Sequence, residues 1–315
     1  MLSPRVSVIM PVYNAEKYIE EAIESICNQT LEDFELIIVD DCGNDSSMEK
    51  VSRIKDKRIK ILHNLENCGI ACSRNRALEA SKGEYIAIMD DDDISMPNRL
   101  QCQADFLDYN TFIDIVGGQS SIIDGRGEVI RQPEIMQEDY KMNKVMFLFY
   151  NSFHNSEVMF RRDLVIHNGI RYADHMLGME DFRFWIDCAC YGKISNVKEE
   201  VLKYRITDVN ETTRVRNEQG KDRKELFGQL RKYSLEKNGF YISERQMKAL
   251  NSVVNEEGTG KCESAQQVMD LFTCMQNLVM QAEKMNKEYV EELKAWLKII
   301  FSNKISESSH LGIWM

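Results

Sequence analysis

Apolar and polar positions form a regular succession along the first half of the chain. Short, nearly continuous apolar runs are typical of strands that are buried on both faces of a sheet. Between these runs, apolar residues recur at helical spacing, as at Ile19, Ala22, Ile23, Ile26 and Cys27. The predicted strands are Val6–Met10, Leu36–Val39, Ile59–Leu62 and Tyr85–Met89. The predicted helices follow Asn14, begin at Ser46, span 71–81 and begin at Pro97.

This alternation predicts an α/β fold, in which a twisted, mostly parallel sheet is covered by helices on both faces. Asn14 is expected to cap the first helix. Ligands of parallel sheets bind outside the carboxyl ends of the strands. Asn14, Asp40–Asp41 and Asp90–Asp93 all follow predicted strands, so we expect them to form one site.

The second half of the chain predicts a mixed arrangement that gives way to helices. Strands are expected at Ile113–Gly117, Ser121–Asp124, Glu128–Arg131, Glu157–Phe160 and Val201–Ile206. Helices are expected at Lys144–Tyr150 and Glu180–Cys190. After residue 210 the pattern is that of long amphipathic helices, with apolar stripes over 268–282 and 289–301. We expect these stripes to pack on each other and on the sheet; docking to a membrane surface or to a second copy is the alternative.

Composition narrows the classes of protein. The chain has 315 residues, with 40 Lys and Arg against 51 Asp and Glu, giving a net charge of −11. An acidic chain is not expected to bind nucleic acid, which requires basic patches. The nine Cys include no CxxC pair, so we expect reduced thiols and neither a disulfide nor a zinc site. The N-terminus lacks the pattern of a signal peptide, and no apolar run approaches the ~18 residues of a membrane span.

The four consecutive acids Asp90–Asp93 stand directly after the apolar run Tyr85–Met89. A buried strand cannot hold four unpaired charges, so the strand must end there. Clustered carboxylate oxygens suit a hard divalent cation such as Mg²⁺ or Mn²⁺. The spacing does not fit a calcium EF-hand, whose sixth and twelfth positions would fall on Ser95 and Gln101. A solvated acidic loop remains the alternative.

Three segments together carry a family resemblance. Val6–Asn14, Gln29–Asp41 and Gly83–Asp93 resemble, in order and spacing, the inverting family 2 glycosyltransferases, which have the GT-A fold. The resemblance covers residues 5–205 and fades in the C-terminal helices. It implies a GT-A domain over 1–210, with a nucleotide-sugar half at 1–110 and an acceptor half at 111–210, followed by a helical region at 211–315.

The resemblance also implies roles for individual residues. Asp41 would accept the N3–H of a uracil base, with Tyr13 stacking on that base. Asp92 would ligate the metal ion, and Asp181, within Leu177–Trp185, would be the general base, with Glu180 beside it. Favourable placement of acids at a helix N-terminus is the alternative for Glu180 and Asp181. The other donor-site residues implied are Pro11, Asn14, Asp40, Arg74, Asp90 and Asp91. The alternative for Asp40 is a structural role as the cap of a loop, and the alternative for Arg74 is a salt bridge at the start of a helix.

The late part of the domain departs from the family pattern. Family members often carry a His shortly after a Tyr-Arg pair, where this chain has Thr207, although Asp208 could substitute. We expect the loop Thr207–Arg216 to close over the donor. His154 could line the acceptor site or be a structural histidine.

We therefore expect a metal-dependent, inverting glycosyltransferase of the hexosyltransferase type that uses a UDP-linked sugar with Mn²⁺ or Mg²⁺. The acceptor would be a saccharide or a lipid-linked saccharide in bacterial surface polysaccharide or lipopolysaccharide synthesis. The expected location is the cytoplasm, where the protein could also lie peripherally at the inner face of the membrane. The rivals are a nucleotidyltransferase, which should carry a Gly-rich phosphate loop after its first strand, and an inactive nucleotide-binding scaffold.

Overall fold

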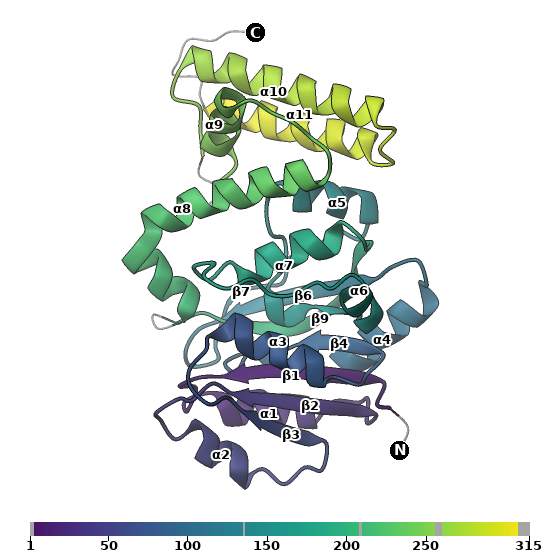
Figure 1. Cartoon of the computed structure of the whole chain (residues 1–315), viewed down its shortest axis with the longest axis vertical. Helices are drawn as coiled ribbons and strands as arrows, with labels where there is room; N and C mark the ends of the chain where they lie inside the picture. Colours follow the sequence, from purple (N-terminus) through teal and green to yellow (C-terminus); the bar gives the residue numbers. More distant parts are fainter. Residues whose placement is uncertain (1–2, 135, 208–209, 256–259, 308–315) are drawn as a thin grey trace.

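The first half of the chain forms a parallel sheet. The structure is a computed structural model that describes residues 3–134, 136–207, 210–255 and 260–307. Strands β1 (Val6–Val12), β2 (Phe34–Asp40), β3 (Ile59–His63) and β4 (Tyr85–Ile88) lie in the order β3-β2-β1-β4 (Figure 1). All three pairings are parallel, with Val6 of β1 opposite both Phe34 and Tyr85. The four strands predicted from the apolar runs are confirmed.

Helices cover both faces of this sheet. They are α1 (Ile19–Cys27), α2 (Ser47–Arg53), α3 (Ile70–Ala80) and α4 (Arg99–Tyr109). Successive residues of a strand point to opposite faces, so β1 contributes to two cores. Val8 packs in the core that holds the buried face of α1, whereas Ile9 packs in the core that holds Leu78 of α3. This arrangement fixes the carboxyl ends of β1, β2 and β4 side by side.

Two local predictions need correction. Asn14 does not cap the first helix, because α1 begins at Ile19 and Tyr18 holds the N-cap position. Asn14 instead adopts a left-handed conformation, with φ of 52°, and its Oδ1 accepts a hydrogen bond from the backbone N–H of Asn44 at 2.8 Å. Asparagine tolerates this conformation better than most residues. Likewise α4 begins at Arg99, after Pro97.

Beyond β4 the sheet becomes mixed. Strand β8 (Met159–Arg161) pairs antiparallel with both β4 and β6 (Ile115–Ile123), while β9 (Ile194–Arg205) runs parallel to β6. The short strands β5 (Ile94–Ser95) and β7 (Val129–Arg131) pair antiparallel with β9 and β6. Helices α5 (Tyr140–Phe149), α6 (Arg162–His167) and α7 (Glu180–Ala189) accompany them.

The strand boundaries in this half differ from the predicted ones. The two strands expected at 113–117 and 121–124 are parts of the single strand β6, whose register shifts after Gly117. A Cβ atom on Gly117 would lie 2.6 Å from the ring of Phe153, so glycine lets this ring pack against the strand. Glu157 lies in a short 3₁₀ helix, Asn155–Glu157, before β8 rather than in it.

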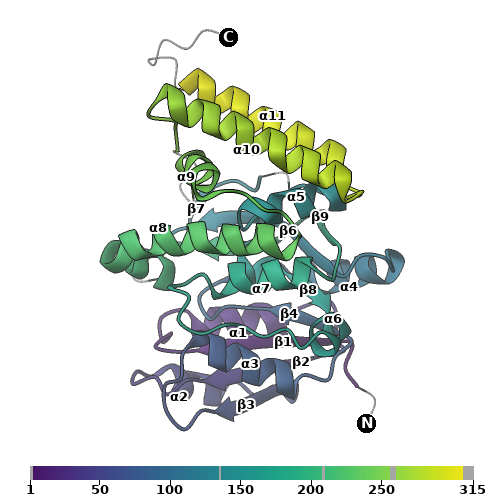
Figure 2. The same cartoon turned by 45° about the horizontal axis from the view of Figure 1, so that its top comes forward.

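The C-terminal region is helical, as predicted. It consists of α8 (Glu211–Lys237), α9 (Glu244–Val253), α10 (Ala265–Lys284) and α11 (Val290–Glu307). Figure 2 shows α10 and α11 side by side over α5. The apolar stripes of both helices bury most of their members in a third core with α5, where Trp296 stacks on Phe149 at 4.1 Å between ring centroids. Packing, rather than membrane docking, therefore accounts for the stripes.

The loop expected at Thr207–Arg216 is largely helical. Residues 211–216 form the first turns of α8, and residues 208–209, which include Asp208, lie outside the described residues. Among the helices that the structure describes, none is both long and apolar enough to cross a membrane.

The cysteines provide another correction. Cys68 and Cys72 form a disulfide, so the expectation that all thiols are unpaired is wrong for this pair. Four residues of separation across the start of α3 bring their Cα atoms to 5.8 Å, which is within the usual range for a disulfide. The two cysteines are not spaced as a CxxC pair, so the sequence pattern does not predict this disulfide.

Candidate active site

The predicted site residues gather at the carboxyl ends of the parallel strands. Tyr13 follows β1, Asp41 follows β2, and the acid run Asp90–Asp93 follows β4. Arg74 reaches the same region from α3, and Asp181 reaches it from the first turn of α7. The sheet order places β1 between β2 and β4, so residues far apart in sequence meet around Tyr13.

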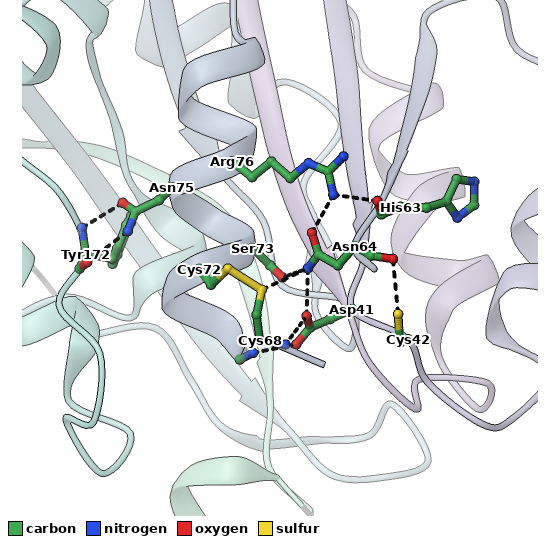
Figure 3. The surroundings of a disulfide bond; sticks show 11 residues. Asp41, Cys42, His63, Asn64, Cys68, Cys72, Ser73, Asn75, Arg76 and Tyr172 are labelled. Atoms are coloured by element: carbon green, nitrogen blue, oxygen red, sulfur yellow. Dashed lines mark hydrogen bonds between the residues drawn. A yellow bond between two sulfur atoms is a disulfide. The ribbon is translucent and has the colours of Figure 1, made fainter. Parts of the chain in front are cut away.

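The Asp41 carboxylate is held by three hydrogen bonds (Figure 3). Its Oδ1 accepts from the side chain of Asn64 at 2.7 Å and from the backbone N–H of Cys68 at 3.0 Å. Its Oδ2 accepts from the backbone N–H of Gly69 at 2.9 Å. A carboxylate offers about four acceptor positions, so one on Oδ2 is left for a ligand. Asp41 is only 3% exposed, and its three hydrogen bonds fix the direction in which that position points.

The loop that holds Asp41 is itself constrained. Gly69 has φ of +86°, a conformation that favours glycine, and this orients its N–H toward Asp41 at the start of α3. The disulfide joins Cys68 to Cys72 on the first turn of α3 (Figure 3). Arg76 donates to Oδ1 of Asn64 at 2.6 Å and so orients the amide whose NH₂ group faces Asp41. The position of the Asp41 carboxylate is thus fixed by several linked elements.

The remaining residues predicted near the nucleotide have varied surroundings. Pro11 is buried within β1, opposite Val39. Tyr13 is 51% exposed, so its ring is available for stacking, and its backbone N–H donates to Asp91 at 3.2 Å. The two oxygens of Asp40 contact the backbone N–H of Cys42 and the ring of His63. Asp40 therefore supports the loop, which favours the structural alternative for this residue.

Each carboxylate of the acid run has a different partner. Asp90 pairs with the buried Arg74 guanidinium at 2.6 Å. Asp92 accepts from the amide of Asn210, while the backbone N–H of Arg205 donates to Asp93 at 2.8 Å. The Oδ2 atom of Asp93 is buried without a hydrogen-bond partner. The run thus carries more negative charge than Arg74 and its neighbours neutralise.

The pKa values of the acid run reflect this crowding. Burial, reinforced by the charge of Asp90, raises the pKa of Asp92 to about 7. Burial, reinforced by the charge of Asp92, also raises the pKa of Asp91 and of Asp93 well above the usual range. A bound cation would reverse this effect, since it favours the ionised carboxylates.

The donor atoms of this cluster fit a hard divalent cation, because they are all carboxylate oxygens. Within the described parts of the chain, no three His, Cys, Asp or Glu side chains converge as a complete metal site. A cation held by Asp92 would therefore complete its coordination with water or with ligand oxygens.

Asp181 has the surroundings of a tuned carboxylate. Its Oδ2 accepts a hydrogen bond from the side chain of Asn151 at 2.9 Å. Burial raises the pKa of Asp181 to about 6, although the charge of Arg74 opposes that effect. Asp90 also acts on this pKa, so the acid run and Asp181 lie within electrostatic range of each other. Glu180 accepts weakly from the backbone N–H of Gly178 at 3.3 Å.

Several residues of the site were missed by sequence reasoning. Asn64 and Asn151 orient the two key carboxylates, and Tyr172 lies under the Arg74 guanidinium at 5.4 Å. Arg205 supports the acid run from β9 through the backbone carbonyl of Asp92 at 2.7 Å. Arg205 belongs to the Tyr-Arg pair of the family pattern, to which no role was given. The other three residues stand alone in the sequence, and no pattern around them marks them as functional.

Comparison with known proteins places the chain in a family. The model of the family described as Glycosyl transferase family 2 matches residues 7–169. An uncharacterised glycosyltransferase of Methanocaldococcus jannaschii is 36% identical over 65% of this chain and 72% of its own length. An uncharacterised glycosyltransferase of Haemophilus influenzae is 34% identical over 79% of each chain. The O-antigen biosynthesis glycosyltransferase WbnJ of Escherichia coli is 33% identical over 64% of this chain and 79% of its own length.

Solved structures share the fold. S. aureus TarS in complex with UDP-GlcNAc is 18% identical, with a TM-score of 0.62 over 93% of this chain and 92% of that chain. The mannosyltransferase PcManGT from Pyrobaculum calidifontis, in complex with GDP-Man and Mn²⁺, is 16% identical, with a TM-score of 0.58 over 99% of this chain and 88% of that one. The fold is GT-A, as expected from the sequence. Together with the family match, these findings show that the chain belongs to glycosyl transferase family 2 and is a glycosyltransferase.

Proposed function

We propose that this glycosyltransferase is metal-dependent and inverting, and that its donor is a UDP-linked sugar. The observation that carries the proposal is the Asp41 carboxylate, which keeps one acceptor position while three hydrogen bonds hold it in place. An acceptor at this point suits uracil, whose N3 carries a proton. Cytosine presents a lone pair at N3 and would repel the carboxylate.

The acid run supports a cation at the diphosphate. Asp92 would hold the ion, and the ionised neighbours would add to the field around it. A divalent cation bound there would stabilise the negative charge that develops on the departing UDP. Arg74 pairs with Asp90 beside the site and offsets part of the negative charge of the run.

Asp181 is proposed to accept the proton of the acceptor hydroxyl. A carboxylate whose pKa lies about 6 is a stronger base than an ordinary aspartate and is still ionised at neutral pH. Asn151 donates to Oδ2 and the backbone N–H of Phe182 donates to Oδ1 at 2.7 Å, so the carboxylate is held in place while each oxygen keeps an acceptor position for the proton. Attack by the deprotonated hydroxyl on the face opposite UDP inverts the anomeric carbon, so an α-linked donor yields a β-glycoside.

The acceptor is proposed to be a saccharide or a lipid-linked saccharide. The similarity to WbnJ, whose name places it in O-antigen biosynthesis, supports a role in polysaccharide assembly. The division into donor and acceptor halves near residue 110 stays a prediction, as does the cellular location.

Nucleotide selectivity tests the proposal. Affinities for UDP and CDP are measured by calorimetry with Mn²⁺, for the wild type and for Asp41→Asn. A hydrogen bond to a charged group contributes about 1.5–3 kcal/mol, so UDP should bind about 10- to 100-fold more tightly than CDP. Asp41→Asn should remove most of this difference.

Asp40→Asn is the matched control. Both Asp40 oxygens already contact His63 and Cys42, so this variant should keep the preference for UDP. Equal affinity of the wild-type protein for UDP and CDP would refute the assignment of Asp41 as the base reader.

A further inference from the structure

A small cavity lies between strands β6 and β7 and the segment 152–157. Its volume is about 140 Å³. The polar side chains that line it include Ser120, Arg131, Glu134, Ser152, His154 and Glu157. None of these residues contributes to the Asp41 or Asp92 sites. The sequence suggests a role only for His154.

Two polar atoms in this wall lack partners. Glu157 is fully buried, and although its Oε2 accepts from Ser120 at 2.5 Å, its Oε1 has no hydrogen-bond partner. The hydroxyl of Ser152 is buried and unpartnered as well. Leaving such groups unsatisfied is costly, so a ligand that supplies both a donor and an acceptor would be stabilised here.

The protonation of Glu157 supports the same conclusion. Burial raises the pKa of Glu157 to about 8, an effect that the hydrogen bond from Ser120 only partly opposes. Near neutral pH the side chain is therefore mostly a neutral carboxylic acid, which can both donate and accept a hydrogen bond. Arg131 and Glu134 carry opposite charges at the exposed side of the cavity, so its overall character is polar and close to neutral.

Two contacts connect the cavity with the site. Ser152 follows Asn151, whose amide holds Asp181. The ring of His154 stacks on Tyr204 at 4.3 Å between centroids. Burial raises the pKa of Tyr204, and the charges of Asp92, Asp93 and Asp181 add to that effect, so its phenol lies close to the acid run and the base. The wall of the cavity is therefore connected, through Asn151 and Tyr204, with the base and the acid run.

We propose that this cavity is an acceptor subsite that binds one uncharged sugar ring, through hydrogen bonds to Glu157 and Ser152. The inference rests on the proposed function and gives the acceptor a defined chemistry. Hydroxyl groups of a sugar both donate and accept, as the two unpartnered atoms require. An anionic sugar would meet no net positive charge here, because Arg131 and Glu134 offset each other and Glu157 is mostly neutral. Bound water is the competing occupant, since it too can satisfy buried polar atoms.

Met136 also lines the cavity and provides a local probe. The protein is labelled with ¹³C-methyl methionine, and the Met136 signal is assigned from the spectrum of Met136→Leu. The methyl glycosides of glucose, galactose, mannose and N-acetylglucosamine are then titrated at high millimolar concentration, without donor. We expect at least one of them to shift the Met136 signal saturably.

Three variants test the contacts. Glu157→Leu should weaken binding of that glycoside by about tenfold, the value of one buried hydrogen bond. Glu157→Gln, which keeps a donor and an acceptor, should retain most of the affinity, and Glu199→Leu on the exposed face of β9 should have no effect. Ser152→Ala provides a second test, with a smaller loss, should Glu157→Leu fail to fold.

The outcomes separate this inference from the proposed function. A titration of the same sample with UDP and Mn²⁺ reports on the donor site alone. Normal UDP binding with no shift of Met136 by any glycoside would mean that the cavity holds water only, and would overturn the inference. The inference would also be overturned if a glycoside shifted the Met136 signal of Glu157→Leu with the same affinity as in the wild type. Glycoside binding without UDP binding would instead contradict the proposed donor.

Discussion

Replacing Asp181 with asparagine should inactivate the enzyme and stabilise it at the same time. Asparagine keeps the size of the side chain and an oxygen that can accept from Asn151. It cannot take a proton from the acceptor, so transfer should fall by about 10²- to 10⁴-fold, the usual contribution of a general base. In the wild type, transfer should also decline as the pH falls below the Asp181 pKa of about 6.

The gain in stability follows from the pKa of Asp181, which burial raises from 3.8 to about 6. A group whose pKa is higher in the folded state stabilises the fold when protonated, and this contribution is lost as the pH rises through the folded pKa. At neutral pH the ionised side chain therefore opposes folding, by at most about 3 kcal/mol for a shift of about 2 pKa units. The Asn variant cannot ionise and escapes this penalty, so its free energy of unfolding should be higher.

The assay pairs UDP release from a UDP-sugar with urea unfolding of the same two proteins. The variant should unfold at higher urea at about pH 7.5, and the difference should shrink as the pH is lowered toward about 4, where Asp181 is protonated in the folded wild type. A variant that keeps at least a tenth of the activity would refute the role as base. A variant that is no more stable at any pH would refute the claim that burial opposes ionisation of Asp181.

Three further predictions concern two supports of the site and the packing of the C-terminal helices. Arg74→Gln should lower the free energy of unfolding by about 3 kcal/mol, measured in urea, because it leaves the Asp90 carboxylate without its partner; an unchanged midpoint would contradict this. Joint replacement of Cys68 and Cys72 by serine should weaken UDP binding by about three- to tenfold, because the loop that holds the base reader is less preorganised. Calorimetry of the oxidised and the reduced wild-type protein should give the same difference, and equal affinities would exclude this role. Trp296→Ala should cost about 3–5 kcal/mol of stability in the helical region and increase its cleavage by protease, while UDP affinity stays unchanged.

The sequence predicts the parallel strands and the acids that follow them, for a physical reason. Apolar runs that alternate with amphipathic helices allow little besides a parallel sheet, and the carboxyl ends of such strands share one edge. Acids that follow these runs must therefore meet. Asp41 follows β2 and Asp92 follows β4, and these two strands flank β1. Both residues therefore lie at this edge, as the pattern implies.

The same reasoning fails where a contact depends on tertiary packing. Asn151 lies 30 residues before Asp181, and Glu157 meets Ser120 from 37 residues away, with no shared pattern to connect them. Asparagine is a favourable helix cap, and a cap is therefore predicted for Asn14. In the structure Asn14 instead adopts a positive φ, which asparagine tolerates better than most residues. In the mixed part of the sheet, glycines and bulges interrupt the alternation on which strand predictions depend.

Titration of the protein with UDP, with and without Mn²⁺, tests the central claim most directly. It is carried out by calorimetry on the wild type and on Asp92→Ala. The account predicts that UDP binds tightly only when Mn²⁺ is present, and that Asp92→Ala removes this dependence together with most of the affinity. Binding of UDP that is equally strong without metal, or that is unchanged in Asp92→Ala, would contradict the assignment of the acid run as the cation site.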